Sequence, residues 1–212
     1  EDKLFFTPYA VNNKFFSNQP DQIQRKTPEL IERLQINDET IVVLFSGKLI
    51  KRKNPALLLE AFYNVIKNDL DRPIYLIFVG HGSEYQSLEK RIQELKLKDK
   101  VKFAGFQNQG EIRQYYSIAD LLVLPSNIET FGLVINEAMN ASTAIISSDK
   151  VGAASDLVID DLNGFVFQSD NLSSLTACLN KALSDKKLLT EMAKESKRII
   201  NGWSYKENIA GI

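Results

Sequence analysis

The sequence predicts an α/β fold in which a parallel sheet of about six strands is covered by helices on both faces. Short segments rich in valine, isoleucine, leucine and phenylalanine alternate along the chain with longer amphipathic segments. Most of the apolar segments are continuous, as expected for strands with both faces buried. Strand–helix alternation of this kind favours parallel pairing, right-handed crossovers and ligand binding at the carboxyl ends of the strands.

The composition excludes several other classes of protein. The 212 residues are 44% hydrophobic and 25% charged, which is typical of a globular chain and excludes disordered, collagen-like and disulfide-rich proteins. The net charge of −1 argues against general nucleic-acid binding. One cysteine and one histidine exclude a cysteine-based or multi-histidine metal site. No apolar run approaches the ~18 residues of a membrane-spanning helix, and the single cysteine fits a reducing cytoplasm.

Six strands and five main helices follow from this pattern. The expected strands are Ile41–Ser46, Ile74–Val79, Val101–Phe103, Leu121–Leu124, Ala144–Ser148 and Phe165–Phe167. Asn54 before Pro55 predicts an N-cap and a first helical position, and Ser83 with Gln86 three residues on predicts a capping box. Apolar residues at helical spacing mark the core faces. They are Leu58, Phe62, Val65 and Ile66; Tyr85, Leu88, Ile92 and Leu95; Ile112, Tyr115, Tyr116 and Ala119; Leu172, Leu175, Leu179 and Ala182; and Leu188, Met192 and Ile199.

The two ends of the chain are less regular than its middle. We interpret residues 1–40 as a lead-in segment, with a linker at Asn12, Asn13, Asn18 and Pro20 and a short helix from Thr27 to about Leu34. Residues 41–200 form the α/β domain, and residues 201–212 form a tail. The chain begins at Glu1 instead of methionine, so we expect a processed chain or an excised fragment.

The loops after the first two strands contain candidate ligand-binding residues. After Gly47, the basic residues are Lys48, Lys51, Arg52 and Lys53. They precede a helix, whose free amides and dipole favour a phosphate; a solvated basic loop is the alternative. After the second strand, Gly80 and Gly82 allow a tight turn. His81 between them is either a turn residue or a residue that faces a ligand. The loop does not match the G-x-G-x-x-G dinucleotide pattern.

Two carboxylates follow the fourth strand. Glu129 is expected in a loop, a helix is expected to begin near residue 130 or 131, and Glu137 then lies about two turns into that helix. Eight helical residues correspond to about 80° of rotation and about 12 Å of rise. The carboxylates would therefore be spread along a ligand, which suits a molecule rich in hydroxyl groups. The amides expected to face an anion are those of Phe131, Gly132 and Leu133. A capping role for Glu129 and a solvent-facing Glu137 are the alternatives.

In their order along the chain, these motifs resemble those of the family 4 (group 1) retaining glycosyltransferases with the GT-B fold. The central motif is Pro125-Ser126-x-x-Glu129-x-Phe131-Gly132-Leu133-Val134-x-x-Glu137-Ala138-Met139. The others are Gly47-Lys48-Leu49 with Lys53, Val79-Gly80-x-Gly82, Val101-x-Phe103-x-Gly105-Phe106, Tyr115-Tyr116-x-x-Ala119-Asp120 and Asp161-x-Asn163-Gly164-Phe165. The resemblance covers residues 4 to 205 and implies a Rossmann-like domain that forms one lobe of a GT-B fold.

The resemblance also implies roles for individual residues. Glu137 would hold the ribose hydroxyls of a nucleotide-sugar donor, such as a UDP- or GDP-sugar, and Glu129 would contact the transferred sugar. Lys48 and Lys53 would neutralise the diphosphate. The residues expected to contact the donor elsewhere are Gly80, His81, Ser126, Phe131, Gly132 and Leu133, with Gly105 and Phe106 near the base. No metal and no further cofactor are expected, and no protein nucleophile is assigned.

Some residues depart from the family pattern. Lys48 stands where arginine is commoner, which keeps the charge but loses the bidentate fork. Ser142 and Ala144 replace the usual glycine and proline, Asp156 replaces a glutamate, and His81 stands where aspartate is frequent.

The resemblance is to the C-terminal, donor-binding lobe alone, so the N-terminal acceptor-binding lobe is expected to be absent from this chain. The tail, residues 201–212, is expected to return toward that missing lobe. We expect the chain to bind a nucleotide-sugar but to transfer nothing by itself. The complete enzyme would move a hexose-type sugar in polysaccharide or glycoconjugate synthesis. It would be cytoplasmic or peripheral to the inner face of the membrane, with membrane contact only through the missing half. The alternatives are a UDP-sugar epimerase of the same fold and a non-catalytic nucleotide-binding module.

Overall fold

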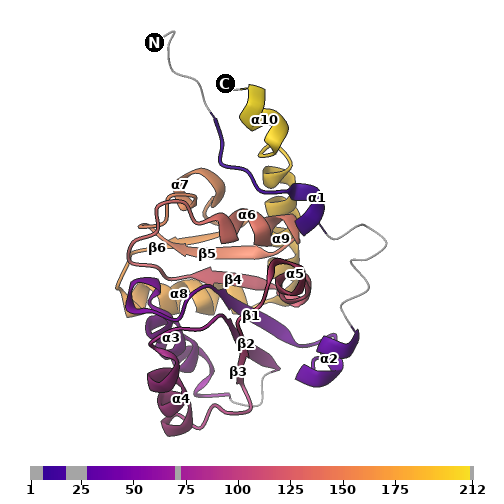
Figure 1. The fold of residues 1–212 in the computed structure, drawn as a ribbon. Helices are drawn as coiled ribbons and strands as arrows, with labels where there is room; N and C mark the ends of the chain where they lie inside the picture. The colour runs from indigo at the N-terminus through magenta and orange to yellow at the C-terminus, as the bar shows by residue number, and fades with distance from the viewer. Residues whose placement is uncertain (1–6, 18–27, 70–72, 211–212) are drawn as a thin grey trace.

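A computed structural model describes residues 7–17, 28–69 and 73–210, and in these residues six parallel strands form one sheet (Figure 1). The strands are β1 Ile41–Ser46, β2 Ile74–Val79, β3 Val101–Gly105, β4 Leu121–Leu124, β5 Ala144–Ser148 and β6 Gly164–Phe167. Four of them have the predicted bounds, β3 continues two residues further, and β6 begins one residue earlier. The predicted fold class is confirmed.

The order of the strands predicts a crevice at the carboxyl ends of β1 and β4. The order is β3-β2-β1-β4-β5-β6, so the chain moves outward from β1 to β3, returns to β4 beside β1, and then moves outward in the other direction. β1 pairs in parallel with both β2 and β4, with Val43 opposite Leu121 in the second pairing. In a sheet of this type, ligands bind at the carboxyl ends of the two strands where the direction reverses.

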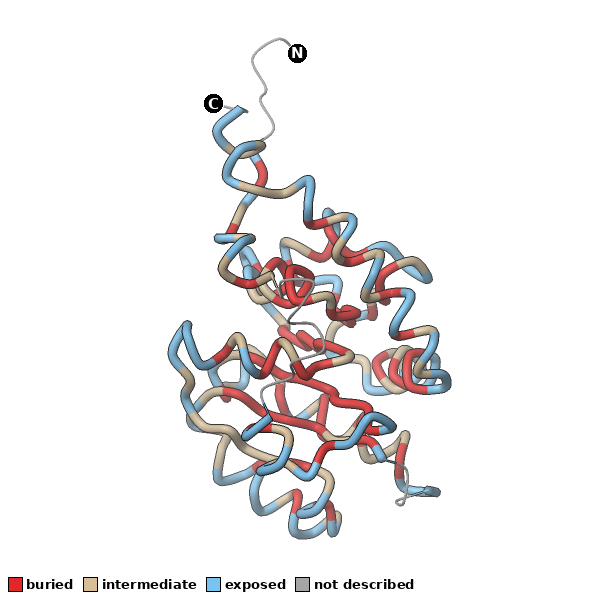
Figure 2. The backbone as a smooth tube through the Cα atoms, turned by 90° about the vertical axis from the view of Figure 1, so that its right-hand side faces the viewer, coloured by how far each residue is buried: buried red, intermediate tan, exposed pale blue. Residues whose placement is uncertain are grey.

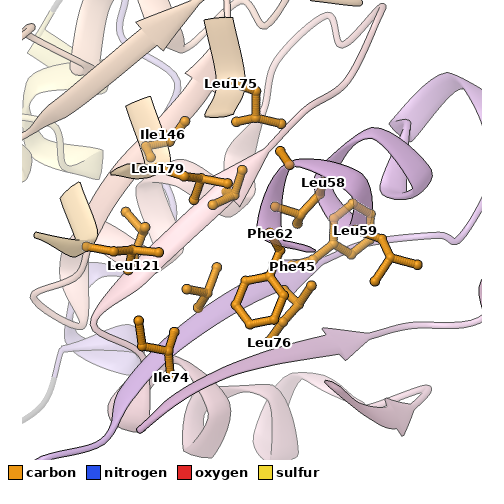
Figure 3. Close-up of a cluster of buried hydrophobic side chains, with 14 of the residues drawn as sticks. Phe45, Leu58, Leu59, Phe62, Ile74, Leu76, Leu121, Ile146, Leu175 and Leu179 are labelled. Atoms are coloured by element: carbon orange, nitrogen blue, oxygen red, sulfur yellow. The ribbon is translucent and has the colours of Figure 1, made fainter. Parts of the chain in front are cut away.

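Helices cover both faces of the sheet and create two apolar cores. One core contains residues from α3 (Pro55–Ile66), α4 (Tyr85–Glu94) and α8 (Leu172–Leu183), and Figure 3 shows its centre. The other contains residues from α2 (Pro28–Leu34), α5 (Gln109–Ile118), α6 (Leu133–Asn140) and α7 (Ala154–Leu157). The long helix α9 (Lys186–Ile200) contributes Leu189 and Met192 to the first core and Ile200 to the second. In Figure 2 the buried residues are concentrated in the strands at the centre.

Three local predictions about helix starts need correction. Asn54 is the N-cap of α3, as predicted, but its side chain caps nothing and hydrogen-bonds to Asn127 instead. The capping box at Ser83 and Gln86 is wrong, because α4 begins at Tyr85 and its N-cap residue, Glu84, makes no side-chain cap. The helix of Glu137 begins at Leu133, two or three residues later than predicted, because Gly132 adopts the left-handed conformation (φ +78°) as its N-cap.

The two ends of the described chain pack against each other. Within the predicted linker, a helix that the sequence did not predict, α1 (Asn13–Phe16), is capped by Asn12. The side-chain amide of Asn13 donates to the carbonyl oxygens of Ile200 (3.2 Å) and Trp203 (3.3 Å). After Trp203 comes α10 (Tyr205–Ala210), and the side-chain amide of Asn208 in this helix donates to the carbonyl of Pro8 (2.7 Å). That the tail returns toward a second lobe stays a prediction.

Some sequence predictions fall outside the described residues, namely those at Asn18, Pro20 and Thr27. Among the helices that the structure describes, none has the length and apolar character needed to cross a bilayer.

Candidate functional site

A cavity of about 370 Å³ lies at the carboxyl ends of β1 and β2, against α5 and α6. It is lined by Ser46, Gly47, Lys48, Val79, Gly80, His81, Phe106, Gln107, Gln109, Ile112, Tyr116 and Glu137. Five of the predicted site residues are therefore brought together from four separate segments: Lys48, Gly80, His81, Phe106 and Glu137. Of the two strands at which the order reverses, β1 contributes Ser46 to the lining, whereas β4 contributes no residue.

Glu137 is held in the wall of this cavity by a buried tyrosine. The phenol of Tyr116 donates to Oε2 of Glu137 at 2.7 Å, and the Ser46 hydroxyl lies 3.1 Å from the same phenol oxygen. Burial raises the pKa of the Glu137 carboxyl, while the hydrogen bond from Tyr116 opposes this shift. Burial, reinforced by the negative charge of Glu137, raises the pKa of Tyr116 well above its ordinary value. At neutral pH Tyr116 is therefore a neutral hydrogen-bond donor.

The turn after β1 is packed directly against the turn after β2. The amide of Gly47 donates to the carbonyl of Val79 (2.9 Å), and the amide of Leu49 donates to that of His81 (3.1 Å). Gly80 has φ +135°, and a Cβ atom there would lie 1.9 Å from the carbonyl oxygen of Gly47. Only glycine fits this approach. Residues of both turns line the cavity, and Lys48 among them is exposed.

Lys53 and Glu129 form a second group, which does not line the cavity. The ammonium of Lys53 and the carboxylate of Glu129 form an ion pair, and their side chains are 13% and 16% exposed. The backbone of Glu129 is held by the next loop, through its amide to Lys150 and its carbonyl to Gly152. The family resemblance assigns Lys53 to the diphosphate and Glu129 to the transferred sugar. In the structure each is the other's partner.

A network of amide and carboxylate side chains joins the loops that carry this ion pair. The Asn54 amide donates to Oδ1 of Asn127 (2.9 Å) and to Oδ1 of Asp170 (2.8 Å). The Asn127 amide also donates to both carboxylate oxygens of Asp170 (3.0 and 3.1 Å). The loops after β1, β4 and β6 are therefore connected at one point. None of these three residues was predicted as part of a site.

The start of α6 presents backbone amides beside an exposed aromatic side chain. The first amides of a helix have no partner one turn earlier within the helix. In α6 the third of them, that of Ile135, donates to the carbonyl of the N-cap residue Gly132 (2.8 Å). Leu133, at the first helical position, and Phe131 before the N-cap are both partly exposed. The Phe131 ring lies 4.5 Å from that of Tyr9 in an edge-on contact. Phe131 thus lies outside the helix.

The remaining predicted residues lie apart from the cavity lining. Gly105 ends β3, and its carbonyl accepts from the Gly80 amide (2.8 Å). Ser126 is fully buried, and within the described part of the chain its hydroxyl has no hydrogen-bond partner. Across residues 7–17, 28–69 and 73–210, no three histidine, cysteine, aspartate or glutamate side chains gather in a way that could hold a metal ion.

The sequence missed several residues of the cavity wall as site residues, above all Ser46 and Tyr116. Tyr116 was assigned to the apolar face of its helix, and it does pack there. A buried tyrosine hydroxyl usually needs a partner, and this requirement was the available signal. Nothing in the spacing indicated that the partner would be Glu137.

A doubly wound parallel sheet with a cavity at the carboxyl ends of its strands defines the Rossmann-like class of ligand-binding domains. Within this class, the chain belongs to the glycosyl transferases group 1 family, whose sequence model matches residues 26–199. The chain is 30% identical over 190 residues to the lipopolysaccharide 1,2-N-acetylglucosaminetransferase of Salmonella typhimurium, which covers 85% of this chain and 49% of the relative. The chain thus spans about half the length of the curated relatives that it matches.

Solved structures show the same fold. The C-terminal domain of a group 1 family glycosyl transferase (LpcC) from Francisella tularensis matches with a TM-score of 0.77 and 22% identity, over 91% of this chain and 97% of that domain. HepE of Anabaena, in complex with UDP and glucose, matches with a TM-score of 0.80 and 23% identity. The match covers 98% of this chain and 55% of the HepE chain. These matches confirm that the chain has the Rossmann-like fold of one lobe of a GT-B protein.

Proposed function

We propose that this chain is the donor-binding domain of a retaining glycosyltransferase, which moves a hexose-type sugar from a nucleoside diphosphate to an acceptor. The observation that carries the proposal is the placement of Glu137. Its carboxylate is held by Tyr116 in the wall of a cavity that also contains Lys48 and Phe106. A carboxylate, a cation and an aromatic ring match the ribose, the diphosphate and the base of a nucleotide.

Each part of the donor has a candidate partner in this chain. Glu137 accepts hydrogen bonds from the ribose hydroxyls, and Phe106 lies near the base. Lys48 and the amides at the start of α6 stabilise the diphosphate, on which negative charge grows as the sugar leaves. The transferred sugar lies toward Glu129, whose ion pair with Lys53 joins two loops of the site.

The reaction in this proposal needs no metal and no protein nucleophile. The attacking hydroxyl approaches the face from which the nucleoside diphosphate leaves, so the configuration of the sugar is retained. Cationic side chains and helix amides supply the stabilisation of the leaving group.

The names of the relatives support a role in polysaccharide or glycoconjugate synthesis. One relative is named a lipopolysaccharide sugar transferase, and one structural neighbour was solved with UDP and glucose. Since this chain spans about half of such relatives, we propose that the acceptor binds to a second, N-terminal lobe outside it. The chain alone would then bind the donor in the cytoplasm without transferring sugar, and any membrane contact would come from the other lobe.

Calorimetric titration of the chain with UDP, GDP and their sugars tests the proposal. We expect at least one of these nucleotides to bind, and we expect Lys48→Ala to weaken its binding about tenfold, because a charge-assisted contact to the diphosphate contributes about 1.5 kcal/mol. The corresponding nucleoside, which lacks phosphate, should bind equally to both proteins.

Lys51→Ala is the matched control, because Lys51 is exposed in the same loop and does not line the cavity. It should retain wild-type affinity at physiological salt. A wild-type chain that binds none of these ligands would exclude the proposal. Equal losses in the two lysine variants would assign the effect to general charge instead of to the cavity.

A further inference from the structure

The strongest unassigned feature of the site is a chain of hydroxyl groups behind Glu137. It begins at Ser46 at the end of β1, passes through Tyr116 on α5, and ends at Oε2 of Glu137 on α6, with separations of 3.1 and 2.7 Å. Tyr116 is 1% exposed. Its ring is backed by Phe16 of α1, with the ring centres 6.2 Å apart. Three elements of the fold therefore meet at one carboxylate.

Packing alone does not account for these polar groups. A phenylalanine at position 116 would fill the same apolar space, and a core without buried polar groups is often equally or more stable. The chain instead buries a phenol hydroxyl against a largely buried carboxylate whose pKa burial has raised. Such an arrangement fixes the orientation of the carboxylate.

The hydrogen bond to Tyr116 determines which lone pairs of Glu137 remain available. Oε2 accepts from Tyr116, while Oε1 accepts no hydrogen bond from the part of the chain that the structure describes. A vicinal diol needs two acceptor positions side by side. Oε1 and the second lone pair of Oε2 supply them only while rotation of the carboxylate is prevented.

We propose that Tyr116 is a positioning residue for ribose recognition: its hydroxyl, held by Ser46, fixes the Glu137 carboxylate in the orientation that binds the 2′ and 3′ hydroxyls of a ribonucleotide. The inference rests on the proposed donor-binding function and deepens it. Discrimination between ribonucleotides and 2′-deoxyribonucleotides then depends on a hydroxyl that acts through the Glu137 carboxylate.

Tyr116→Phe removes only the hydroxyl and tests the inference by calorimetry with UDP and 2′-deoxy-UDP between pH 5 and pH 8. We expect the wild-type chain to prefer UDP. The variant should bind UDP about tenfold more weakly, with a much smaller loss for 2′-deoxy-UDP, because one hydrogen bond to a charged group is lost. The preference for the ribose should therefore shrink.

A pH profile distinguishes positioning from a general loss of structure. Ribose binding needs the ionised carboxylate, so affinity for UDP should fall as pH decreases through the pKa of Glu137. The Tyr116 hydrogen bond holds that pKa down, so in the variant the fall should begin at higher pH. The other titratable side chains that line the cavity are Lys48 and His81, and both remain in the variant.

Tyr115→Phe is the matched control. Tyr115 is also buried on α5, and its hydroxyl also contacts a charged group, Arg33 (2.9 Å), but it does not line the cavity. This variant should keep the wild-type preference and pH profile. A Tyr116→Phe chain with an unchanged UDP preference and pH profile would overturn the inference.

Ser46→Ala is the substitute variant if Tyr116→Phe does not fold, since loss of the Ser46 hydroxyl frees the phenol to rotate. An unchanged UDP preference in that variant would also overturn the inference.

The wild-type chain separates the inference from the proposed function. If it binds UDP-like ligands but shows no ribose preference, the inference fails and the donor site stands. If it binds no nucleotide, both fail.

Discussion

Replacing Glu137 by glutamine is expected to weaken nucleotide binding and, at neutral pH, to stabilise the fold. Glutamine has the same shape and can still accept from Tyr116, but it offers the ribose a neutral group with a single acceptor oxygen. Losing the charge in these hydrogen bonds corresponds to about 2 kcal/mol, or about a thirtyfold weaker affinity for UDP.

The gain in stability follows from the pKa of Glu137. Burial raises the pKa of the folded carboxyl above the ordinary value of 4.5. A raised folded pKa gives stability that is fully present below the unfolded pKa and is lost as pH rises through the folded pKa. Glutamine does not titrate, so Glu137→Gln should be more stable than the wild type at pH 7.5. The difference should disappear near pH 4.

Urea denaturation at both pH values, together with UDP titration, measures the two effects. Glu39→Gln is the control: it makes the same change on an exposed side chain, and it should alter neither the free energy of unfolding nor the affinity for UDP. A Glu137→Gln chain that is less stable than the wild type at pH 7.5, or that binds UDP with undiminished affinity, would contradict this account of the site. Stability given up for function is common at binding sites.

Replacing Gly164 by alanine is expected to cause a large loss of stability, because the added methyl group would clash with the neighbouring strand. Gly164 is the first residue of β6 and is paired with Ile145 of β5. A Cβ atom at this position would lie 1.8 Å from the carbonyl oxygen of Ile145 and 2.7 Å from its carbonyl carbon. Backbone atoms in a paired strand cannot move aside, so we expect a loss of about 3 kcal/mol or more in the free energy of unfolding.

Gly202→Ala is the control for this substitution. A Cβ atom there would meet only the carbonyl oxygen of Ile199, at the ordinary contact distance of 3.6 Å. Its effect should stay within about 0.5 kcal/mol. Thermal denaturation followed by circular dichroism should show a melting temperature lowered by roughly 6–12 °C in Gly164→Ala and nearly unchanged in Gly202→Ala. Equal melting temperatures would show that the sheet can accommodate the methyl group.

The strands were predictable because both faces of this sheet are buried. The strand Ile41–Ser46 is buried along its whole length. Where short apolar runs alternate along the chain with amphipathic helices, a continuous apolar run is typical of a strand with both faces buried. The helix starts were less predictable because backbone geometry competes with side-chain capping. Before α4 the amide of Glu84 donates to the carbonyl of Leu49 and the amide of Tyr85 donates to that of Gly82, so these amides bond to backbone carbonyls and the helix begins at Tyr85.

The site could be predicted only in part, because sequence motifs do not specify contacts between elements. The order of the motifs places Lys48 and His81 directly after strands and Glu137 in the helix after the fourth strand, and the fold brings all three to one cavity. The same reasoning grouped Lys53 with Lys48. In the structure Lys53 pairs with Glu129, a contact across 76 positions of sequence that no local pattern indicates, and its role at the diphosphate stays a prediction. The phenol of Tyr116 reaches Glu137 in the same way, from a neighbouring helix.

A crystal structure of the chain with UDP is the most direct test of the central claim that the cavity binds a nucleotide donor. We predict density for the nucleotide between the turn of Gly47 and the start of α6, with ribose hydroxyl oxygens within hydrogen-bond distance of the Glu137 carboxylate and the diphosphate beside Lys48. Density in the separate cavity of about 280 Å³ between Arg33 and Lys102, or a ribose without contact to Glu137, would contradict the claim.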